Sequence, residues 1–135
     1  MLAACQILCL CAELTDQTRF MIGSKELAEL PKGAVVVNAA RGELLDLDAL
    51  VAALDSGHVS PVGLDVVSPE PLPAVPPLLS HPNTVLTPHT AGVTAEATAR
   101  LAQSAADQIM AALNGERPQF PVNPEAWDGP ASRRP

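Results

Sequence analysis

The stretch Ala34-Val35-Val36-Val37-Asn38-Ala39-Ala40-Arg41-Gly42 carries the main clue to the fold. Its first four residues are apolar and mostly β-branched, which is typical of a strand buried on both faces of a parallel sheet. Polar residues follow where this strand should end. Because open parallel sheets bind ligands beyond the carboxyl ends of their strands, the stretch predicts a buried strand that leads into a functional loop.

On either side of this stretch, segments typical of strands and helices alternate. Residues 7–11, 62–67 and 84–86 are short apolar runs of strand length. The expected helices begin after the N-caps Ser24, Asp46 and Thr94, and they end near Pro31, Gly57 and Asn114. The five prolines between positions 69 and 77 predict an extended loop that is not helical. The alternation predicts the α/β class, with a partial doubly wound, Rossmann-like parallel sheet and helices on both faces.

Composition narrows the class of protein. Hydrophobic residues make up 47% of the 135 residues and charged residues 17%, as in globular proteins. The net charge is −7 and the cationic residues are scattered, so we expect no nucleic-acid partner. No apolar run approaches the roughly 20 residues that span a bilayer, so we expect no membrane partner and a cytoplasmic location.

The cysteines are all near the beginning of the sequence, at Cys5, Cys9 and Cys11. Cys9 and Cys11 should share one face of a strand, but no second ligand pair completes a zinc site. We therefore expect no metal, and we interpret the three thiols as buried apolar side chains.

Four polar residues lie near the ends of three predicted strands: Arg41 after residues 34–37, Asp65 and Glu70 near the end of residues 62–67 and beyond it, and His89 after residues 84–86. Each has a simple alternative explanation. Arg41 could pair with Glu43 or Asp46, Glu70 could be a solvated loop charge, and His89 could be an ordinary turn histidine. A carboxylate in a strand, such as Asp65, usually needs a partner. Because all four should meet at one rim of the sheet, we favour a functional site.

Three segments resemble signatures of the D-isomer-specific 2-hydroxyacid dehydrogenases, of the phosphoglycerate dehydrogenase and hydroxypyruvate/glyoxylate reductase type. Residues 37–42, followed by Leu45-Asp46 and Ala49-Leu50, resemble the second signature of the family. Residues 63–66 with 69–73 resemble the third, and residues 82–89 resemble the histidine segment. The resemblance covers residues 5 to about 125, so it implies the C-terminal portion of such an enzyme.

The resemblance implies a role for each matching residue. His89 is expected to be the acid/base, Glu70 to pair with its imidazole, and Arg41 to hold the substrate's carboxylate and carbonyl oxygen. Asp65 is expected to bind the nicotinamide carboxamide. The residues expected to contact the cofactor, NAD with NADP as the alternative, are Ala12, Ala39, Ala40, Arg41, Asp65, His89 and Gly92. The substrate would be a small 2-keto or 2-hydroxy acid.

One motif of dinucleotide sites is missing, because no two of the eight glycines are spaced to form Gly-x-Gly-x-x-Gly. Glu13 also stands where the family usually has proline. We therefore expect residues 1–115 to be the C-terminal half of an NAD(P)-binding domain and residues 116–135 a Pro-rich, mobile tail left from the substrate-domain return segment. Such a chain should be marginally stable and should form a homodimer or associate with a missing N-terminal half.

Two other functions remain open at this point. The chain could be a non-catalytic dinucleotide-linked binding protein, similar to the corepressors that reuse this fold, or an inactive fragment. The intact set of Arg41, Glu70 and His89 favours an oxidoreductase, since these three residues together bring no advantage in packing. The missing glycine loop favours a truncated form.

Overall fold

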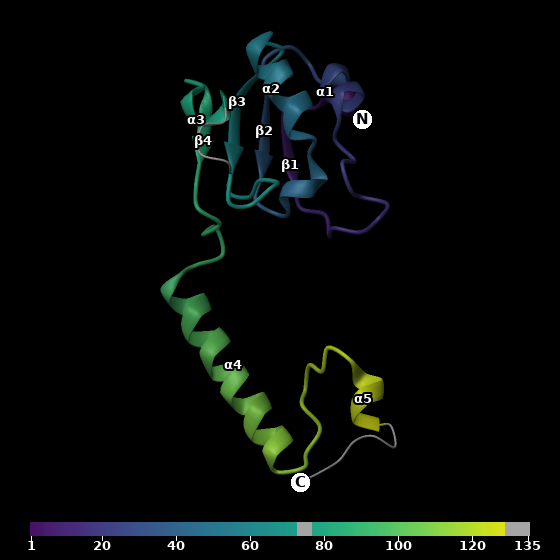
Figure 1. The fold of residues 1–135 in the computed structure, drawn as a ribbon, viewed down its shortest axis with the longest axis vertical. Helices are drawn as coiled ribbons and strands as arrows, with labels where there is room; N and C mark the ends of the chain where they lie inside the picture. Colours follow the sequence, from purple (N-terminus) through teal and green to yellow (C-terminus); the bar gives the residue numbers. More distant parts are fainter. Residues whose placement is uncertain (73–76, 129–135) are drawn as a thin grey trace. The chain divides into compact units, whose positions relative to one another are not determined.

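The computed structural model describes residues 1–72 and 77–128, and the chain divides into two compact units, Met1–Ala91 and Gly92–Pro135. The first unit contains a four-stranded sheet whose order follows the sequence (Figure 1). All neighbouring strands are parallel. The strands are β1 (Ile7–Leu10), β2 (Ala34–Asn38), β3 (Val59–Leu64) and β4 (Thr84–Leu86).

Helices connect these strands. The first unit contains the 3-10 turns η1 (Leu2–Ala4) and η2 (Gly42–Leu44) and the α-helices α1 (Ser24–Glu29), α2 (Leu47–Asp55) and α3 (Pro77–Ser80). The predicted α/β class with a Rossmann-like parallel sheet is confirmed. The predicted domain boundary at residues 115/116 stays a prediction, and the division into two compact units falls between Ala91 and Gly92.

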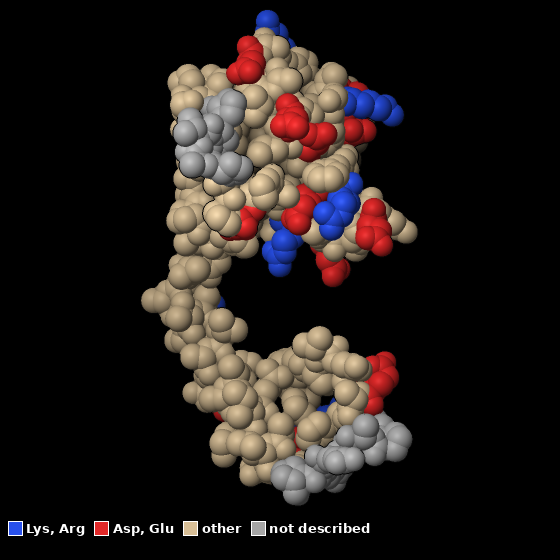
Figure 2. Space-filling model, in the orientation of Figure 1, with Lys and Arg blue, Asp and Glu red and all other residues tan. Residues whose placement is uncertain are grey.

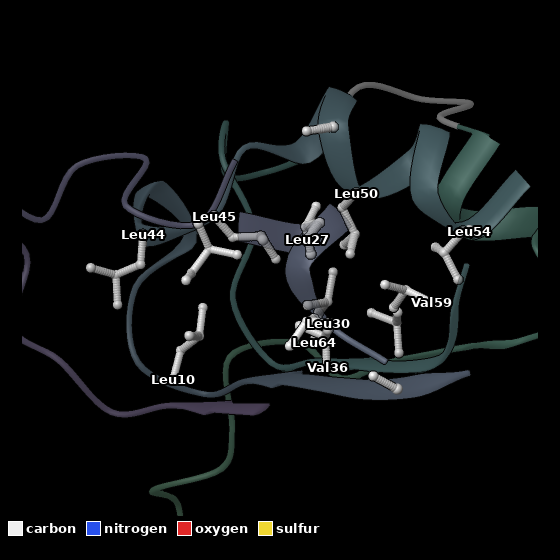
Figure 3. Close-up of a cluster of buried hydrophobic side chains, with 14 of the residues drawn as sticks. Leu10, Leu27, Leu30, Val36, Leu44, Leu45, Leu50, Leu54, Val59 and Leu64 are labelled. Atoms are coloured by element: carbon white, nitrogen blue, oxygen red, sulfur yellow. The ribbon is translucent and has the colours of Figure 1, made fainter. Parts of the chain in front are cut away.

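The core of the first unit lies between the sheet and helices α1 and α2. Leu27 and Leu30 from the α1 segment belong to one buried cluster with Leu50 and Leu54 of α2, and Figure 3 shows this cluster with strand residues such as Val36 and Val59. Leu78 of α3 belongs to the same cluster. Asp46 caps α2 as predicted, since its Oδ1 accepts a hydrogen bond of 3.1 Å from the backbone N–H of Ala49.

The opposite face of the sheet is much less covered within this unit. Residues of β2 alternate between buried and half-buried, so the strand is fully buried on one face only, contrary to the prediction. Ile7 on β1 and Val85 on β4 are 62% and 65% exposed. Cys9 and Cys11 are exposed, so our interpretation of the cysteines as buried side chains was wrong for these two. Their side chains alternate with the buried Leu10, and they therefore lie on the open face.

Three element boundaries also differ from the predictions. β3 begins and ends three residues earlier than predicted, and the chain bends at Asp65 directly after it. Ser24 is the first residue of α1 rather than its N-cap, and the Gly23 N–H is instead satisfied by Glu26 at 3.2 Å. Pro77 begins α3, which is permitted because the first turn of a helix does not use the missing N–H. Pro73 and Pro76 lie outside the described residues.

The second unit contains the long helix α4 (Ala95–Leu113) and the short helix α5 (Pro124–Asp128). Thr94 caps α4 as predicted, accepting a hydrogen bond of 3.1 Å from the N–H of Ala97. The segment after α4 folds back on its polar side, where the Phe120 N–H donates to Gln108 Oε1 at 3.0 Å. The region predicted as a mobile tail therefore contains a helix. Residues 129–135 of that predicted tail lie outside the described residues.

Charged side chains are interspersed on the surface of the first unit. On the face shown in Figure 2, basic and acidic groups of residues 1–91 alternate, and no cationic stripe is seen there. Among the helices that the structure describes, none is both long and apolar enough to cross a membrane.

Candidate active site

The carboxyl ends of the four parallel strands bring the predicted site residues to one edge of the sheet. Ala12 follows β1, and Arg41 lies in the loop after β2. Asp65 follows β3 directly, and His89 is in the loop after β4. This is the edge at which open α/β sheets bind their ligands.

The loop that carries Arg41 is shaped by Asn38, the last residue of β2. Asn38 is 1% exposed, and its side-chain amide donates to the Arg41 carbonyl at 2.9 Å while its Oδ1 accepts from the Ala40 N–H at 3.1 Å. Both ends of this buried amide are therefore used to fold the loop. The guanidinium of Arg41 donates to the Ala40 carbonyl at 2.6 Å.

Arg41 does not form the simple surface ion pair considered from the sequence. The carboxylate of Glu43 lies 4.0 Å from Arg19, and that of Asp46 caps α2. Arg41 is exposed and keeps most of its five N–H donors for another group. A solvent-facing guanidinium with spare donors suits the recognition of a carboxylate.

Gly42 brings the Arg41 loop against the segment after β3. A Cβ atom at position 42 would overlap the backbone carbonyl of Val67 and would crowd the backbone nitrogen of Ser68. Only glycine permits this close approach of two backbones. The approach places Arg41 beside the segment that leads to Glu70.

Glu70 and His89 form a direct pair. The Nδ1 atom of His89 lies 3.1 Å from Glu70 Oε1 and 3.2 Å from Oε2. Both side chains are about half exposed, so the pair faces solvent rather than the core. Because a carboxylate accepts hydrogen bonds, this contact places the Nδ1 proton toward Glu70 and leaves Nε2 available to another partner.

Asp65 holds the loop on which His89 is located. Its Oδ1 accepts hydrogen bonds from the Thr87 hydroxyl and from the Thr90 N–H at 2.8 Å, and its Oδ2 accepts from the Ala91 N–H at 2.9 Å. The backbone carbonyl of Asp65 also accepts from the His89 N–H at 2.9 Å. His89 itself has a φ of 55°, in the left-handed region that costs energy for residues other than glycine.

These contacts lower the pKa of Asp65 below its ordinary value of 3.8. The Thr87 hydroxyl is the largest cause, followed by the N–H of Ala91, while burial opposes the shift. Hydrogen bonds to the ionised form stabilise the carboxylate. Asp65 is 8% exposed and is therefore a buried anion whose charge is used within the site.

The catalytic candidates line one pocket. Arg41, Glu70 and His89 lie around a hollow of about 370 Å³ whose walls also include Gly42 and the segment from Val66 to Pro69. Ala12, Ala39 and Ala40 line a neighbouring hollow of about 480 Å³ together with Arg41. Since Arg41 borders both, the two pockets adjoin at its side chain.

Two of the predicted site residues, Asp65 and Gly92, do not line either of these two hollows. Asp65 lines a third pocket together with Glu70 and Thr87. Gly92 is the first residue of the second compact unit.

Sequence reasoning did not assign three residues that build the site: Asn38, Gly42 and Thr87. A polar residue directly after an apolar strand was the available signal for Asn38 and Thr87. For Gly42 no local signal exists, because its neighbour Val67 is distant in the sequence.

The fold and this geometry define a class. A parallel α/β sheet that presents a paired His and Glu beside an exposed Arg at its carboxyl edge is suited to polar chemistry on a small anionic molecule. Small alanine side chains in the adjoining hollow leave space for a flat ring.

Comparison with known proteins identifies the family. The family model described as "D-isomer specific 2-hydroxyacid dehydrogenase, NAD binding domain" matches residues 1–91. This chain belongs to that family, as the sequence motifs indicated.

Among curated relatives, glyoxylate/hydroxypyruvate reductase B of Yersinia enterocolitica is 42% identical over 125 residues, covering 93% of this chain and 38% of the relative. A solved protein from Thermus thermophilus is 38% identical with a TM-score of 0.87, covering 90% of this chain and 39% of that one. A D-isomer specific 2-hydroxyacid dehydrogenase from Xanthobacter autotrophicus Py2, solved with NADPH and MES, is 38% identical with a TM-score of 0.75, covering 93% and 51%. This chain therefore spans about two fifths of the curated relative.

Proposed function

We propose that this chain contributes the nicotinamide end and the acid/base residues of an oxidoreductase that interconverts a D-2-hydroxy acid and its 2-keto acid with NAD(P)(H). The observation that supports this proposal best is that Arg41, Glu70 and His89 border one pocket at the carboxyl edge of the sheet. The relatives named as glyoxylate/hydroxypyruvate reductases support the same class of substrate.

His89 is the proposed acid/base. Its Nδ1 faces Glu70 at 3.1 Å, so Nε2 is the nitrogen that gives a proton to the carbonyl oxygen of the keto acid or takes it from the hydroxyl. Glu70 orients the imidazole ring and keeps a proton on Nδ1, the nitrogen that faces the carboxylate. When bound, the cofactor supplies or accepts the hydride at the carbonyl carbon.

Arg41 is the proposed substrate anchor. Its planar guanidinium can hold a carboxylate through two parallel hydrogen bonds and can also reach the adjacent carbonyl oxygen. The hydrogen bond from the guanidinium to the Ala40 carbonyl uses one N–H group of Arg41 and sets the direction of its side chain. Because Arg41 borders both pockets, it would hold the carboxylate of the substrate next to the cofactor ring.

The residues present fit the nicotinamide end of a dinucleotide. Ala12, Ala39 and Ala40 have small side chains and leave the hollow open for a ring. Asp65 has about four acceptor sites, of which three are used by Thr87, Thr90 and Ala91. The contacts of Asp65 with the carboxamide and of Gly92 with the cofactor stay proposals. The phosphate-binding Gly-x-Gly-x-x-Gly motif is not among these 135 residues, and NAD rather than NADP is proposed from the name of the matched domain.

The absence of that motif from the sequence also favours a second candidate, a non-catalytic dinucleotide-linked binding protein or inactive fragment. NADH oxidation with glyoxylate or hydroxypyruvate, followed by absorbance, separates the two. We expect turnover that falls at least about a hundredfold in His89→Gln, since general acid–base groups contribute on that scale. The substitution of Glu96 by Gln, on α4, serves as the control for a surface change. Equal rates in His89→Gln and the unchanged chain would refute the catalytic assignment, and binding without turnover would favour the second candidate.

We also infer that the chain forms a homodimer through α4. Leu101, Ile109, Met110 and Leu113 are more than half exposed, and no described residue of α4 is buried. An exposed apolar face of this kind drives association, and we propose that a second copy of this chain covers it. Light scattering should give a dimer mass that shifts toward the monomer in the double variant Leu101→Gln, Leu113→Gln. A monomer mass for the unchanged chain would contradict the inference.

A further inference from the structure

The loop after β4 holds His89 in a conformation that the local sequence does not favour. The φ of 55° places a residue with a side chain in the left-handed region, which costs of order 1 kcal/mol. Such a conformation persists only where surrounding contacts determine it. The contacts that do so here come from Asp65 and not from Glu70, because Glu70 touches only the ring.

Three groups of this loop donate to the Asp65 carboxylate. The Thr87 hydroxyl lies before His89, and the N–H groups of Thr90 and Ala91 lie after it. The carboxylate therefore closes the loop around His89 from both sides. Thr87 is the only side chain among these three donors, and its hydroxyl shares Oδ1 with the Thr90 N–H.

We propose that Thr87 is a positioning residue for the acid/base His89. Its hydroxyl fixes the rotation of the Asp65 carboxylate, so that the two oxygens meet the N–H groups of Thr90 and Ala91 and the His89 ring is held against Glu70. The proposal rests on the proposed function in one respect, namely that His89 is the acid/base. The set of hydrogen bonds from Thr87, Thr90 and Ala91 to the Asp65 carboxylate, here called the latch, is a property of the folded chain and needs neither cofactor nor substrate.

A second threonine provides a matched control. The hydroxyl oxygen of Thr84 is buried and has no hydrogen-bond partner within the described part of the chain. Thr84 and Thr87 are three residues apart, and the change to valine removes one hydroxyl from each at nearly constant volume. A difference between the two variants therefore reports the hydrogen bond to Asp65 and not the general effect of a Thr→Val change.

The test is carried out on the whole 135-residue chain by NMR, with amide exchange at Thr90 and Ala91 and the ¹⁵N signals of the His89 ring as readouts. In Thr87→Val we expect exchange at both amides to accelerate at least about tenfold, since a hydrogen bond to a charged group is lost. The Nδ1 signal should move toward that of an unpaired histidine. Thr87→Ser should restore both readouts, and Thr84→Val should change neither.

Several results would overturn the proposal. Unchanged exchange and ring signals in Thr87→Val would show that the hydroxyl does not position the loop. If Thr87→Val fails to fold, Thr87→Ser decides, because loss of amide protection there would show that the methyl group matters instead. Because no cofactor is present, absence of turnover in the enzyme assay leaves this test intact. If the chain shows turnover but the His89 signal is unaffected in Thr87→Val, the positioning role of Thr87 is refuted and the proposed function still stands.

Discussion

Helices α2 and α4 begin in the same way and have very different surroundings. Both are rich in alanine, and both begin at a side-chain cap, Asp46 in one and Thr94 in the other. Leu50 of α2 is 0% exposed, whereas Leu101 of α4 is 72% exposed. The comparison teaches that local sequence is sufficient to start a helix, while the burial of its apolar side depends on a surface supplied from elsewhere.

The largest effect that sharpens this comparison is expected at Leu50. Replacing it by alanine removes buried methyl groups between α2 and the sheet and should reduce the free energy of unfolding by about 2–5 kcal/mol. At chain concentrations low enough for the monomer, the matched change Leu101→Ala should alter it by less than about 0.5 kcal/mol, because that side chain is then mostly in water. Urea unfolding followed by circular dichroism measures both. Equal losses in the two variants would show that α4 is packed as tightly as α2.

A second pair of variants compares the packed edge of the first unit with its open face. Gly42→Ala puts a Cβ onto the Val67 carbonyl and should cost about 1–3 kcal/mol while displacing the Arg41 loop. At Gly63 the nearest atom to a new Cβ is a methyl of Val37 at 3.9 Å, which is an ordinary contact. Gly63→Ala should therefore be tolerated. Similar urea midpoints for the two variants would contradict the close approach seen at Gly42.

The α/β class could be predicted from the sequence because apolar periodicity is local. The strands at Ile7–Leu10 and Thr84–Leu86 and the helices capped by Asp46 and Thr94 all follow from neighbouring residues. The coverage of the sheet could not be predicted this way. Apolar runs such as Ala34–Val37 look the same whether one face or two are packed, and for this reason the exposure of Cys9 was missed.

In the candidate site, too, local features could be predicted from the sequence and contacts between distant segments could not. The sequence placed Arg41, Glu70 and His89 after successive strands, and the parallel sheet brings them together. Contacts between segments that are distant in the sequence could not be predicted from the sequence. The hydrogen bond from Thr87 to Asp65 joins residues 22 positions apart, and the close approach of Gly42 to Val67 depends on two loops that meet only after folding.

Smaller and nearly equal effects are expected at the two helix caps. Asp46→Ala and Thr94→Ala each remove one hydrogen bond to a first-turn N–H, at Ala49 and at Ala97. Each change should weaken its helix by about 1 kcal/mol, because capping is a local interaction. Amide exchange at these two positions should therefore accelerate by a similar factor. A large effect at Asp46 with none at Thr94 would mean that α4 does not begin where the structure places it.

The smallest expected effect is the loss of stability at low pH that comes from the protonation of Asp65. The pKa of Asp65 is lowered in the folded chain, so its contribution to stability is fully present above its ordinary value of 3.8 and is lost as the pH falls through the lower, folded value. In Thr87→Val the pKa of Asp65 should move up toward 3.8, because the largest cause of the shift is removed. The carboxyl ¹³C signal of Asp65, followed from about pH 6 to about pH 2, measures this directly. Identical titrations of the two chains would show that the hydroxyl does not donate to the carboxylate in solution.

The most direct test of the proposed nicotinamide site is calorimetric titration of the whole chain with NADH, with Ala39→Leu as the variant that fills the alanine-lined hollow and Glu96→Gln as the surface control. We predict saturable binding in the micromolar range that is weakened by Ala39→Leu and unchanged by Glu96→Gln. Absence of binding at millimolar NADH, or equal binding by the Ala39→Leu chain, would contradict the assignment of this edge of the sheet to the cofactor.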